Sequence, residues 1–256
     1  QVAVFDTGFF RDLPPVARTY ALPRALNAKY GLRRYGFHGL AHHALWRRWT
    51  ALRPDLPHGG RVISFQLGSG CSVAAVANGR ALDTSMGFSP LEGLVMATRG
   101  GDLDPGVLLH LIRDQGMSQD ALAHLLSHEA GLAGLSGRGG DLRELLAAED
   151  ADARLAVDVY CYRARKYLGA YLAVLGGADA ILFGGGVGEN APAVRAGILA
   201  GGEWAGIALD PVANRAARGV EADIAMPASR VALHVLRVDE ARELADAARA
   251  LLAGGA

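Results

Sequence analysis

The residues best suited to phosphate chemistry in this sequence lie in two glycine-rich turns. The first turn, Gly68-Ser69-Gly70, lies between two apolar runs that have the character of strands. Glycine lets a backbone approach phosphate closely and offer it successive amide donors, so this turn could hold phosphate oxygens. Taken alone, the same residues more often form an ordinary turn between two strands.

The second turn runs from Gly184 to Gly188 and continues into Glu189 and Asn190, between an apolar run and the start of a helix. A turn at the carboxyl end of a strand is a common place for a ligand. A tight strand-to-helix connection without any ligand explains these glycines equally well. The chain lacks the Walker lysine signature, the His-Arg-Asp triplet of protein kinases and the Gly-x-Ser-x-Gly elbow of serine hydrolases. A phosphotransferase without a Walker motif is therefore the favoured class.

Strands and helices alternate along the chain, which indicates an α/β fold. Asn78-Gly79 joins two apolar runs and predicts a type I′ hairpin. Proline after a capping residue marks two helix starts, at Pro90 and Pro105. Strands are predicted at 2–5, 61–67, 72–77, 80–84, 180–183 and 231–238. Helices are predicted near 24–29, from Pro90, from Pro105, from Ser118 to about 131, over 152–175, from Pro192 and over 239–252.

The composition argues against several classes of partner. Of the 256 residues, 26 are Lys or Arg and 26 are Asp or Glu, and this balance disfavours nucleic acid and acidic membrane surfaces. No apolar run approaches the length of a membrane span. The two cysteines, Cys71 and Cys161, lack metal-ligand spacing, which predicts free thiols in a reducing, cytoplasmic compartment.

Seven stretches, in order along nearly the whole chain, resemble the acetate kinase family, of the acetate and propionate kinase type within the actin-like ATPase superfamily. They are Phe5-Asp6-Thr7, Tyr20-Ala21-Leu22-Pro23, residues 33–39, residues 83–93, residues 98–105, Ser136-Gly137 with Asp141-Leu142-Arg143, and residues 185–190. The resemblance implies an α/β fold, namely an actin-like ATPase (ribonuclease H-like) domain with a mixed sheet and flanking helices.

The resemblance also implies how the domains are divided. Family enzymes have a preceding actin-like half with an Asn-x-Gly-Ser-Ser-Ser loop and a further arginine, and neither feature occurs in this sequence. The sequence starts with an apolar run and does not begin with Met, so it is expected to be a piece of a longer protein. Residues 1–10 would end the preceding domain and cross over, 11–238 would form the C-terminal nucleotide-binding domain, and 239–256 would pack back on the preceding domain. This piece alone is expected to be inactive, because one wall of a cleft cannot exclude water.

The activity implied by the resemblance is transfer of the γ-phosphate of ATP to a short-chain carboxylate such as acetate or propionate. The products are an acyl phosphate and ADP, Mg²⁺ assists, and no covalent enzyme intermediate forms. Family members are commonly homodimers. Because two anions react, the site must supply positive charge. Arg99 would contact the carboxylate and the moving phosphoryl group, and His38 would steady that group. Asp6 and Glu240 would serve the metal ion.

The remaining site residues implied by the resemblance surround ATP and the acid. Phe37 and Pro90 would be apolar walls of the small acyl pocket. The ATP-binding residues would come from both glycine turns and from one further segment, namely Gln66, Gly68, Ser69, Gly70, Asp141, Leu142, Arg143, Gly186, Val187, Gly188 and Asn190.

Several of these assignments have ordinary structural alternatives. Arg99 could form a surface salt bridge with Asp102 or Asp104, and Asp6 could be a turn former. Glu240 could be no more than a helix-start carboxylate, and Asp239 beside it is a rival metal ligand.

The sequence also departs from the family pattern on the phosphate side. Gln66 and Phe10 each replace a histidine, Ser69 replaces an asparagine, and Leu40-Ala41 replaces Thr-Ser. These changes leave open a slower enzyme, another phosphoryl donor or another short acid. They also leave open a degenerate module that binds nucleotide without catalysis. A sugar kinase of the same superfamily lacks support from residues 83–93.

Overall fold

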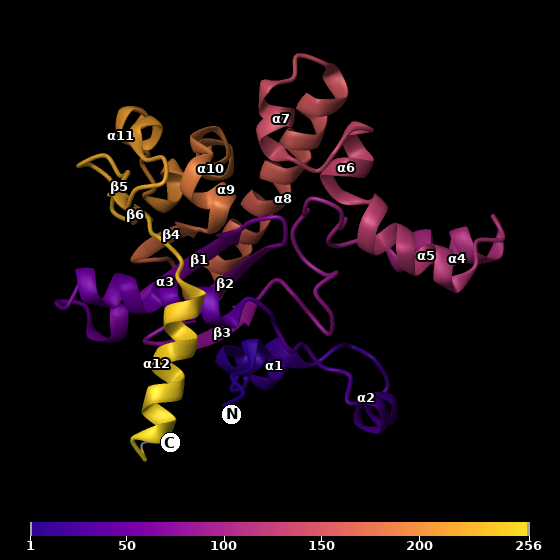
Figure 1. Ribbon diagram of the computed structural model, residues 1–256, viewed down its shortest axis with the longest axis horizontal. Coiled ribbons are helices and arrows are strands. Elements are labelled where there is room, and N and C mark those ends of the chain that lie inside the picture. Colours follow the sequence, from indigo (N-terminus) through magenta and orange to yellow (C-terminus); the bar gives the residue numbers. More distant parts are fainter. Residues whose placement is uncertain (1, 255–256) are drawn as a thin grey trace.

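The computed structural model describes residues 2–254, and these residues fold around a mixed sheet of six strands (Figure 1). The strand order is β3-β2-β1-β4-β6-β5. The neighbours β1, β2 and β3 pair antiparallel, whereas β1, β4 and β6 run parallel and β5 pairs antiparallel with β6. The strands are β1 (Arg61–Leu67), β2 (Cys71–Ala77), β3 (Arg80–Thr84), β4 (Ala180–Gly184), β5 (Ala222–Asp223) and β6 (Ala232–Val235).

The parallel pairing of β1 with β4 brings the two glycine turns to one edge of the sheet. Gln66 lies opposite Gly184 in the ladder, so both strands end at the same level. From there β1 turns through residues 68–70 into β2, while β4 leads directly into helix α9 (Gly185–Asn190). The expected glycine loop is thus largely helical, and Gly185, with a φ of +77°, allows the sharp change of direction.

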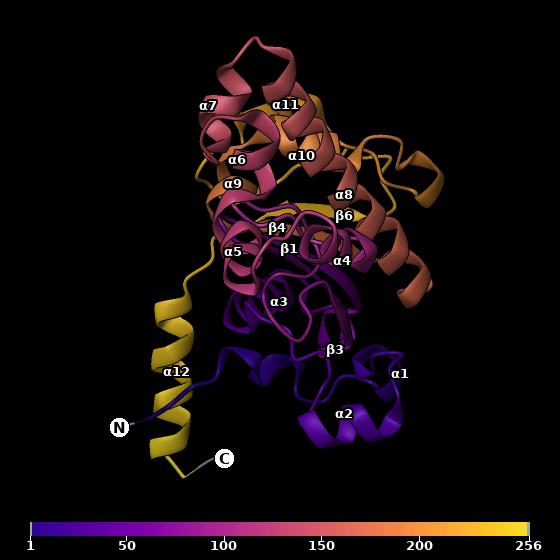
Figure 2. The ribbon, with the colours of Figure 1, turned by 90° about the vertical axis from the view of Figure 1, so that its right-hand side faces the viewer.

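Alternate side chains of the sheet enter two cores, one on each face. Helices cover both faces of the sheet (Figure 2). On one face, Ile63 and Phe65 of β1 pack in the same cluster as residues of the long helix α8 (Ala151–Leu175). On the other face, Val62 clusters with Trp49 of helix α3 (Gly39–Leu52). Apolar burial on both faces, at about 25 cal/mol per Å², fixes the sheet edge that carries the glycine turns.

Most of the predicted helices are present, and several of them begin with a side-chain cap. Asp104 accepts a hydrogen bond from the Gly106 amide at 2.8 Å, with Pro105 at the first helical position. The other helical elements are α1 (Pro15–Arg18), α2 (Arg24–Tyr30), α4 (Pro105–Arg113), α5 (Gln119–His124), α6 (Gly131–Ser136), α7 (Leu142–Ala147), α10 (Pro192–Leu199), α11 (Pro211–Ala216) and α12 (Glu240–Leu252), with single turns η1 (Asp6–Phe10), η2 (Pro57–Gly59), η3 (Leu125–Glu129) and η4 (Glu203–Ala205).

Two predictions of secondary structure were wrong. Residues 2–5 form no strand, and Phe5 is 75% exposed, so the apolar run is not part of the sheet. No helix begins at Pro90 either. The segment around it is held in an irregular path by Arg34, which donates to the carbonyls of Thr84, Ser85 and Met86.

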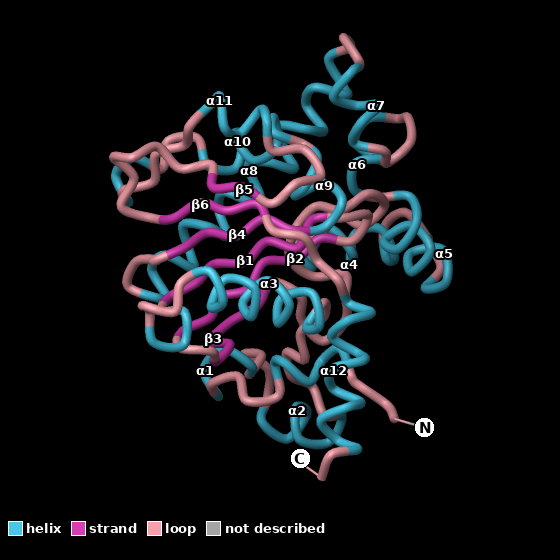
Figure 3. Tube along the Cα trace, turned by 60° about the vertical axis from the view of Figure 1, so that its left-hand side comes forward, coloured by secondary structure: helices cyan, strands magenta, loops and turns pink. Residues whose placement is uncertain are grey.

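The last helix, α12, lies against α3 and extends past the sheet (Figures 1 and 3). Its buried Glu243 accepts a hydrogen bond from His43 and pairs with Arg47, with both contacts at 2.6 Å. Leu244 and Leu251 of the same helix are exposed. Within residues 2–254, no helix is both long enough and apolar enough to cross a bilayer.

Candidate active site

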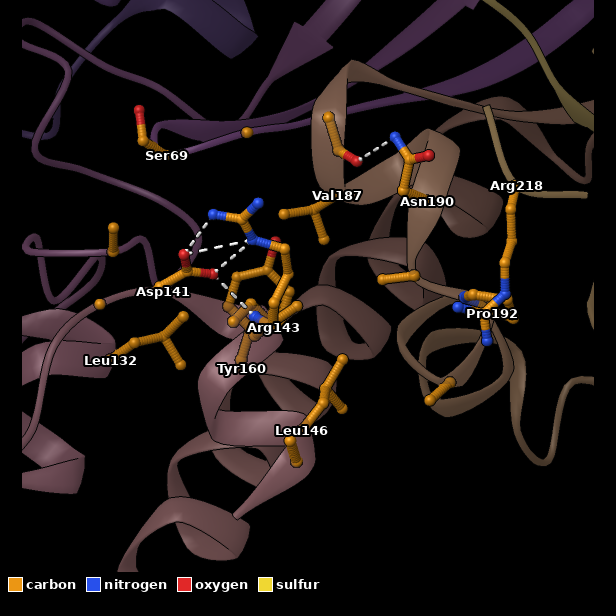
Figure 4. A pocket seen from close by; sticks show the side chains of 18 of the residues that line it. Ser69, Leu132, Asp141, Arg143, Leu146, Tyr160, Val187, Asn190, Pro192 and Arg218 are labelled. Carbon is orange, nitrogen blue, oxygen red and sulfur yellow. Dashed lines mark hydrogen bonds and ion pairs between the residues drawn. The ribbon is translucent and has the colours of Figure 1, made fainter. Parts of the chain in front are cut away.

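The two glycine turns open onto one shared cleft of about 1070 Å³ (Figure 4). Gly68 and Ser69 line it from the β1–β2 turn, and Gly186, Val187 and Asn190 line it from α9. The third predicted ATP segment joins them, because its three predicted residues also line the cleft, namely Asp141, Leu142 and Arg143. A cleft of this size is ample for a nucleotide.

Gly70 lies where two of the predicted catalytic side chains meet. A Cβ atom placed on Gly70 would be 2.7 Å from Arg99 Nη2 and 3.3 Å from His38 Nε2. The absence of a side chain at this position lets both groups reach the end of the glycine turn between β1 and β2. On the opposite side of the turn, the Ser69 carbonyl accepts from the Ala97 amide at 3.0 Å, which fixes the turn to the chain that leads to Arg99.

The guanidinium of Arg99 is oriented by the backbone and not by a carboxylate. Its Nη1 donates to the Pro90 carbonyl at 2.8 Å. Asp102, the rival salt-bridge partner, is occupied elsewhere, because it accepts from the Gly93 amide at 2.8 Å and from Tyr167 Oη at 2.9 Å. Among the described residues Arg99 forms no ion pair, so its charge is available to an anion.

Asp6 fixes His38 through the backbone. One carboxylate oxygen of Asp6 accepts from the His38 amide at 2.6 Å, and the other accepts from the Leu40 amide at 3.1 Å. His38 has a left-handed conformation, with φ +58°, directly before α3. A side chain on Gly39 would collide with the Asp6 carbonyl, which explains the Phe-His-Gly sequence here. Burial lowers the pKa of His38, Asp6 opposes that shift, and Arg99 adds to it.

Glu240 lies close enough to Asp6 for the two carboxylates to influence each other. Burial raises the pKa of Glu240, and the negative charge of Asp6 raises it further. The neighbouring Asp239 caps α12 by accepting from the Arg242 amide at 2.9 Å. Of the two rival carboxylates, Glu240 is thus the one free of a capping role. No group of three or more His, Cys, Asp or Glu side chains suited to a metal occurs within residues 2–254.

Asp141 and Arg143 form a tight pair at the cleft (Figure 4). Arg143 Nη2 lies 2.5 Å from Asp141 Oδ2, and the same carboxylate caps α7 through the Arg143 amide at 2.9 Å. The hydrogen bonds from Arg143 lower the pKa of Asp141 to about 2. The carboxylate is therefore ionised at neutral pH, and Arg143 reaches the cleft with its charge already partly balanced.

Nine predicted site residues do not line this cleft. Three of them were assigned to ATP, namely Gln66, Gly70 and Gly188, and the other six are Asp6, Phe37, His38, Pro90, Arg99 and Glu240. Gly188 is buried in α9, and its carbonyl accepts from Arg195 Nη1 at 2.7 Å. Gln66 lies beneath the cleft, and a Cβ on Gly185 would be 2.9 Å from its Nε2. Its Oε1 is buried without a hydrogen-bond partner among the described residues. Gly70 faces Arg99 and His38, as described above. Phe37 is half-buried and packs on the core beside α8.

Other residues of the site escaped the sequence analysis. Tyr160 of α8, Thr98 and Arg218 also line the cleft, and Arg218 forms no ion pair within the described part of the chain. Arg34 holds residues 83–93 in place through Glu92, whose other oxygen accepts from Tyr20 Oη, and both contacts measure 2.5 Å. Arg34 belongs to the family stretch at residues 33–39, which could have identified it as a site residue. The sequence around Arg218 contains no motif that indicates a role in the cleft.

Comparison with known proteins identifies the family of this chain. The family model described as the acetokinase family matches residues 1–246. The chain belongs to the acetokinase family. It is 48% identical over 244 residues to the acetate kinase of Solibacter usitatus, which covers 94% of this chain and 59% of that protein. The acetate kinase of Streptomyces coelicolor is 47% identical over 256 residues, with 98% of this chain and 62% of that protein covered.

Solved structures of the acetokinase family confirm the predicted fold class. The crystal structure of Porphyromonas gingivalis acetate kinase superposes with a TM-score of 0.95 at 40% identity, covering 97% of this chain and 63% of that one. The propionate kinase from Francisella tularensis gives a TM-score of 0.88 at 33% identity, covering 94% and 62%. The chain thus spans about 60% of the length of the relatives it matches.

Proposed function

We propose that the protein to which this chain belongs is an acyl phosphotransferase that moves the γ-phosphate of ATP to a short-chain carboxylate such as acetate or propionate. The products are an acyl phosphate and ADP. The observation that carries the proposal is the meeting of Arg99 and His38 at Gly70, at the end of the turn that lines the cleft. Relatives named acetate kinase and propionate kinase support this choice of acid.

The geometry suits a direct transfer between two anions. Arg99 has one guanidinium nitrogen fixed on the Pro90 carbonyl and another directed at Gly70, so it offers a pre-oriented positive charge beside the phosphate turn. His38 is held from behind by Asp6 and offers its Nε2 edge to the same place. Positioning and charge neutralisation supply most of the catalysis in phosphoryl transfer, so no side chain needs to form a covalent intermediate.

The two carboxylates Asp6 and Glu240 fit a magnesium ion. Their mutual repulsion, which contributes to the raised pKa of Glu240, would be relieved by a divalent cation. Magnesium is usually held by one or two carboxylates together with water and substrate phosphates, so a pair is sufficient. When bound, the ion would neutralise charge on the transferring phosphate. Asp6 would serve it while continuing to cap α3 through its amide contacts.

The cleft divides into regions that fit the parts of ATP. Gly68, Ser69 and Gly70 would lie along the phosphates, with Gln66 beneath them. The adenosine would lie between α7 and α9, against Leu142 and Val187 and near the Asp141–Arg143 pair, a region of mixed apolar and polar character. Gly186, Gly188 and Asn190 would shape its far wall. The methyl or ethyl group of the acid would lie between Pro90 and Phe37. The carbonyl of Pro90 accepts a hydrogen bond from Arg99, and Phe37 precedes His38 in sequence.

The remaining proposals concern the whole protein. Residues 11–238 would be the nucleotide-binding domain, residues 1–10 the end of the preceding domain and a crossover, and 239–256 a helix that packs on that preceding domain. Residues 1 and 255–256 lie outside the described part. Exposed Leu244 and Leu251 of α12 support that docking role. We also propose a homodimer, by analogy with the family. A cytoplasmic location is supported by Cys71 and Cys161, both free and buried.

An assay of acyl phosphate formation by the full-length gene product tests the function. With ATP and Mg²⁺, turnover is expected with acetate, propionate or both. Failure with acetate, propionate and butyrate would contradict the proposal. Calorimetry with ATP should accompany the assay, because binding without turnover would instead indicate a module that holds nucleotide but does no chemistry. Residues 1–256 alone are expected to be inactive, since the cleft would be open to water.

A further inference from the structure

A chain of hydrogen bonds leads from His38 to buried side chains in the interior. His38 Nδ1 lies 2.9 Å from Ser72 Oγ, and Ser72 Oγ lies 2.7 Å from His42 Nε2. His42 Nδ1 then lies 2.7 Å from Ser64 Oγ. Ser64, His42 and Ser72 are all 0% exposed, so none of them can exchange its partner for bulk water.

Counting the available protons shows which group donates in each of these hydrogen bonds. Each serine hydroxyl brings one proton, and each neutral imidazole brings one N–H. Within residues 2–254, Ser64 Oγ has no hydrogen-bond partner other than His42 Nδ1, so its proton must go there. The proton of His42 is then on Nε2 and is donated to Ser72. Ser72 in turn donates to His38 Nδ1, and the proton of His38 is left on Nε2.

The other arrangements each leave a buried donor without an acceptor. If His38 Nδ1–H donated to Ser72, the sequence of bonds would reverse and the Ser64 hydroxyl would point at nothing. If both rings donated to Ser72, the hydroxyl proton of Ser72 itself would have no acceptor. An unpaired buried donor loses its hydration without compensation, so the arrangement that satisfies every group is strongly favoured.

We propose that Ser64, His42 and Ser72 are positioning residues that set the ring tautomer of His38, so that an N–H, and not a lone pair, is presented at Gly70. The Nε2 edge of His38 faces the space beside Gly70 that it shares with Arg99. With this tautomer both side chains are donors toward one anion. A lone pair at Nε2 would repel that anion. The importance of the tautomer rests on the proposed function, in which the anion is the transferring phosphoryl group.

The tautomer can be measured directly in the full-length protein. Long-range ¹H–¹⁵N correlation spectra of histidine-labelled protein show which ring nitrogen carries the proton. We expect protons on Nε2 of both His38 and His42. A proton on Nδ1 of His38 would overturn the proposal. This spectrum requires no turnover, so the proposal on the tautomer and the proposed function can fail independently.

Variants test whether these hydrogen bonds control the ring tautomer of His38. In Ser72→Ala the donor to His38 Nδ1 is removed, so nothing fixes the proton on Nε2. We expect this variant to show a mixture of His38 tautomers and a fall in kcat of about tenfold, with the KM for ATP within about twofold of the unmodified protein. In His42→Gln the side-chain amide can still donate to Ser72, and in His42→Met the Ser72 hydroxyl has only His38 Nδ1 left as an acceptor. We expect both His42 variants to keep the Nε2–H tautomer of His38. An unchanged tautomer in a folded Ser72→Ala protein would refute control of His38 by these hydrogen bonds. If Ser72→Ala does not fold, the spectrum of the unmodified protein decides.

Discussion

Arg99 Nη2 lies 2.7 Å from the point that a Cβ atom on Gly70 would occupy. The atom in the way is the far end of a flexible side chain, not a backbone atom. Adding a methyl group at Gly70 should therefore displace the guanidinium and leave the fold intact. A substitution at Gly70 can therefore test the role of this glycine in the site without disturbing folding.

We expect Gly70→Ala to lower kcat/KM for acyl phosphate formation by about 10- to 100-fold, because small displacements of an aligned group are costly. Thermal unfolding should be nearly unchanged. The matched control is Gly169→Ala, since a Cβ at this position in α8 meets nothing within 4 Å. Equal activity in the two variants would show that Arg99 does not depend on the open space at Gly70.

Arg218 should contribute to nucleotide affinity. It lines the cleft just after α11 and forms no ion pair among the described residues, so its charge is free for a nucleotide. We expect Arg218→Ala to raise the Kd for ATP by about tenfold, as measured by calorimetry. Arg215→Ala is the control, because Arg215 belongs to α11 but does not line the cleft. The KM for the carboxylate should stay the same in both variants, and a shared loss of ATP affinity would count against a specific contact.

Arg195 should be important for stability and for the shape of α9. Its guanidinium is fully buried and donates to Gly188 O, to Ala217 O and to both oxygens of Asn214, at 2.7–2.8 Å. We expect Arg195→Leu to reduce the free energy of unfolding by about 3 kcal/mol, because several buried acceptors lose their donor. In chemical denaturation, the exposed Arg165→Leu should change that free energy by about 0.5 kcal/mol or less. A similar small change in Arg195→Leu would mean that the site repacks without cost.

Glu240 should make the metal-free protein sensitive to pH. Its folded-state pKa is raised above the ordinary 4.5, so the folded state holds the proton more tightly than the unfolded state does. That stabilisation is present below pH 4.5 and is lost as the pH rises through the folded-state pKa. The side chain is largely exposed, so the effect should be small.

Magnesium should reverse this trend, because the proton and the cation compete for the same carboxylate. We expect the stabilisation by Mg²⁺, read as a shift in Tm, to grow as the pH rises from about 4.5 toward neutrality. In Glu240→Gln this growth should be reduced, since the amide does not titrate. Asp239→Asn keeps the capping oxygen and serves as the control. A Mg²⁺ response in Glu240→Gln that rises as steeply as in the unmodified protein would place the ion elsewhere.

Elements with local signals were predicted well. Asn78-Gly79 marks the β2–β3 hairpin because its turn type requires these residues, and helix α8 shows its period over 25 residues. Helix α3 was missed because its start has no local cap. The capping carboxylate is Asp6, 32 residues from His38 in sequence. The short apolar run at residues 2–5 gave a false strand signal, because such a run carries no information about whether a neighbouring strand exists.

The candidate site could likewise be predicted only where the sequence carries a local signal. Family stretches marked Arg99, His38 and the second glycine turn, and the strand–glycine–strand pattern marked the first. The structure brings the two turns to one cleft, and Arg99 and His38 to Gly70 at the end of the first turn. Arg218 and Arg195 were not foreseen, because an arginine in a helix or after it carries no signal until the fold places it. The hydrogen-bond chain behind His38 could not be foreseen either, since Ser64 and Ser72 belong to different strands and meet through a helical histidine.

The pairing of Gln66 with Gly184 restricts how this chain can change in length. Inserting one residue into β1 or β4 would displace one glycine turn from the other by about 3.3 Å and invert the faces of every side chain beyond it. At the opposite ends of the strands, the Asn78-Gly79 turn and the Gly176-Gly177 connection do not line the cleft. Insertions and deletions between homologues should therefore accumulate there, and the distance between the two glycine turns should stay constant.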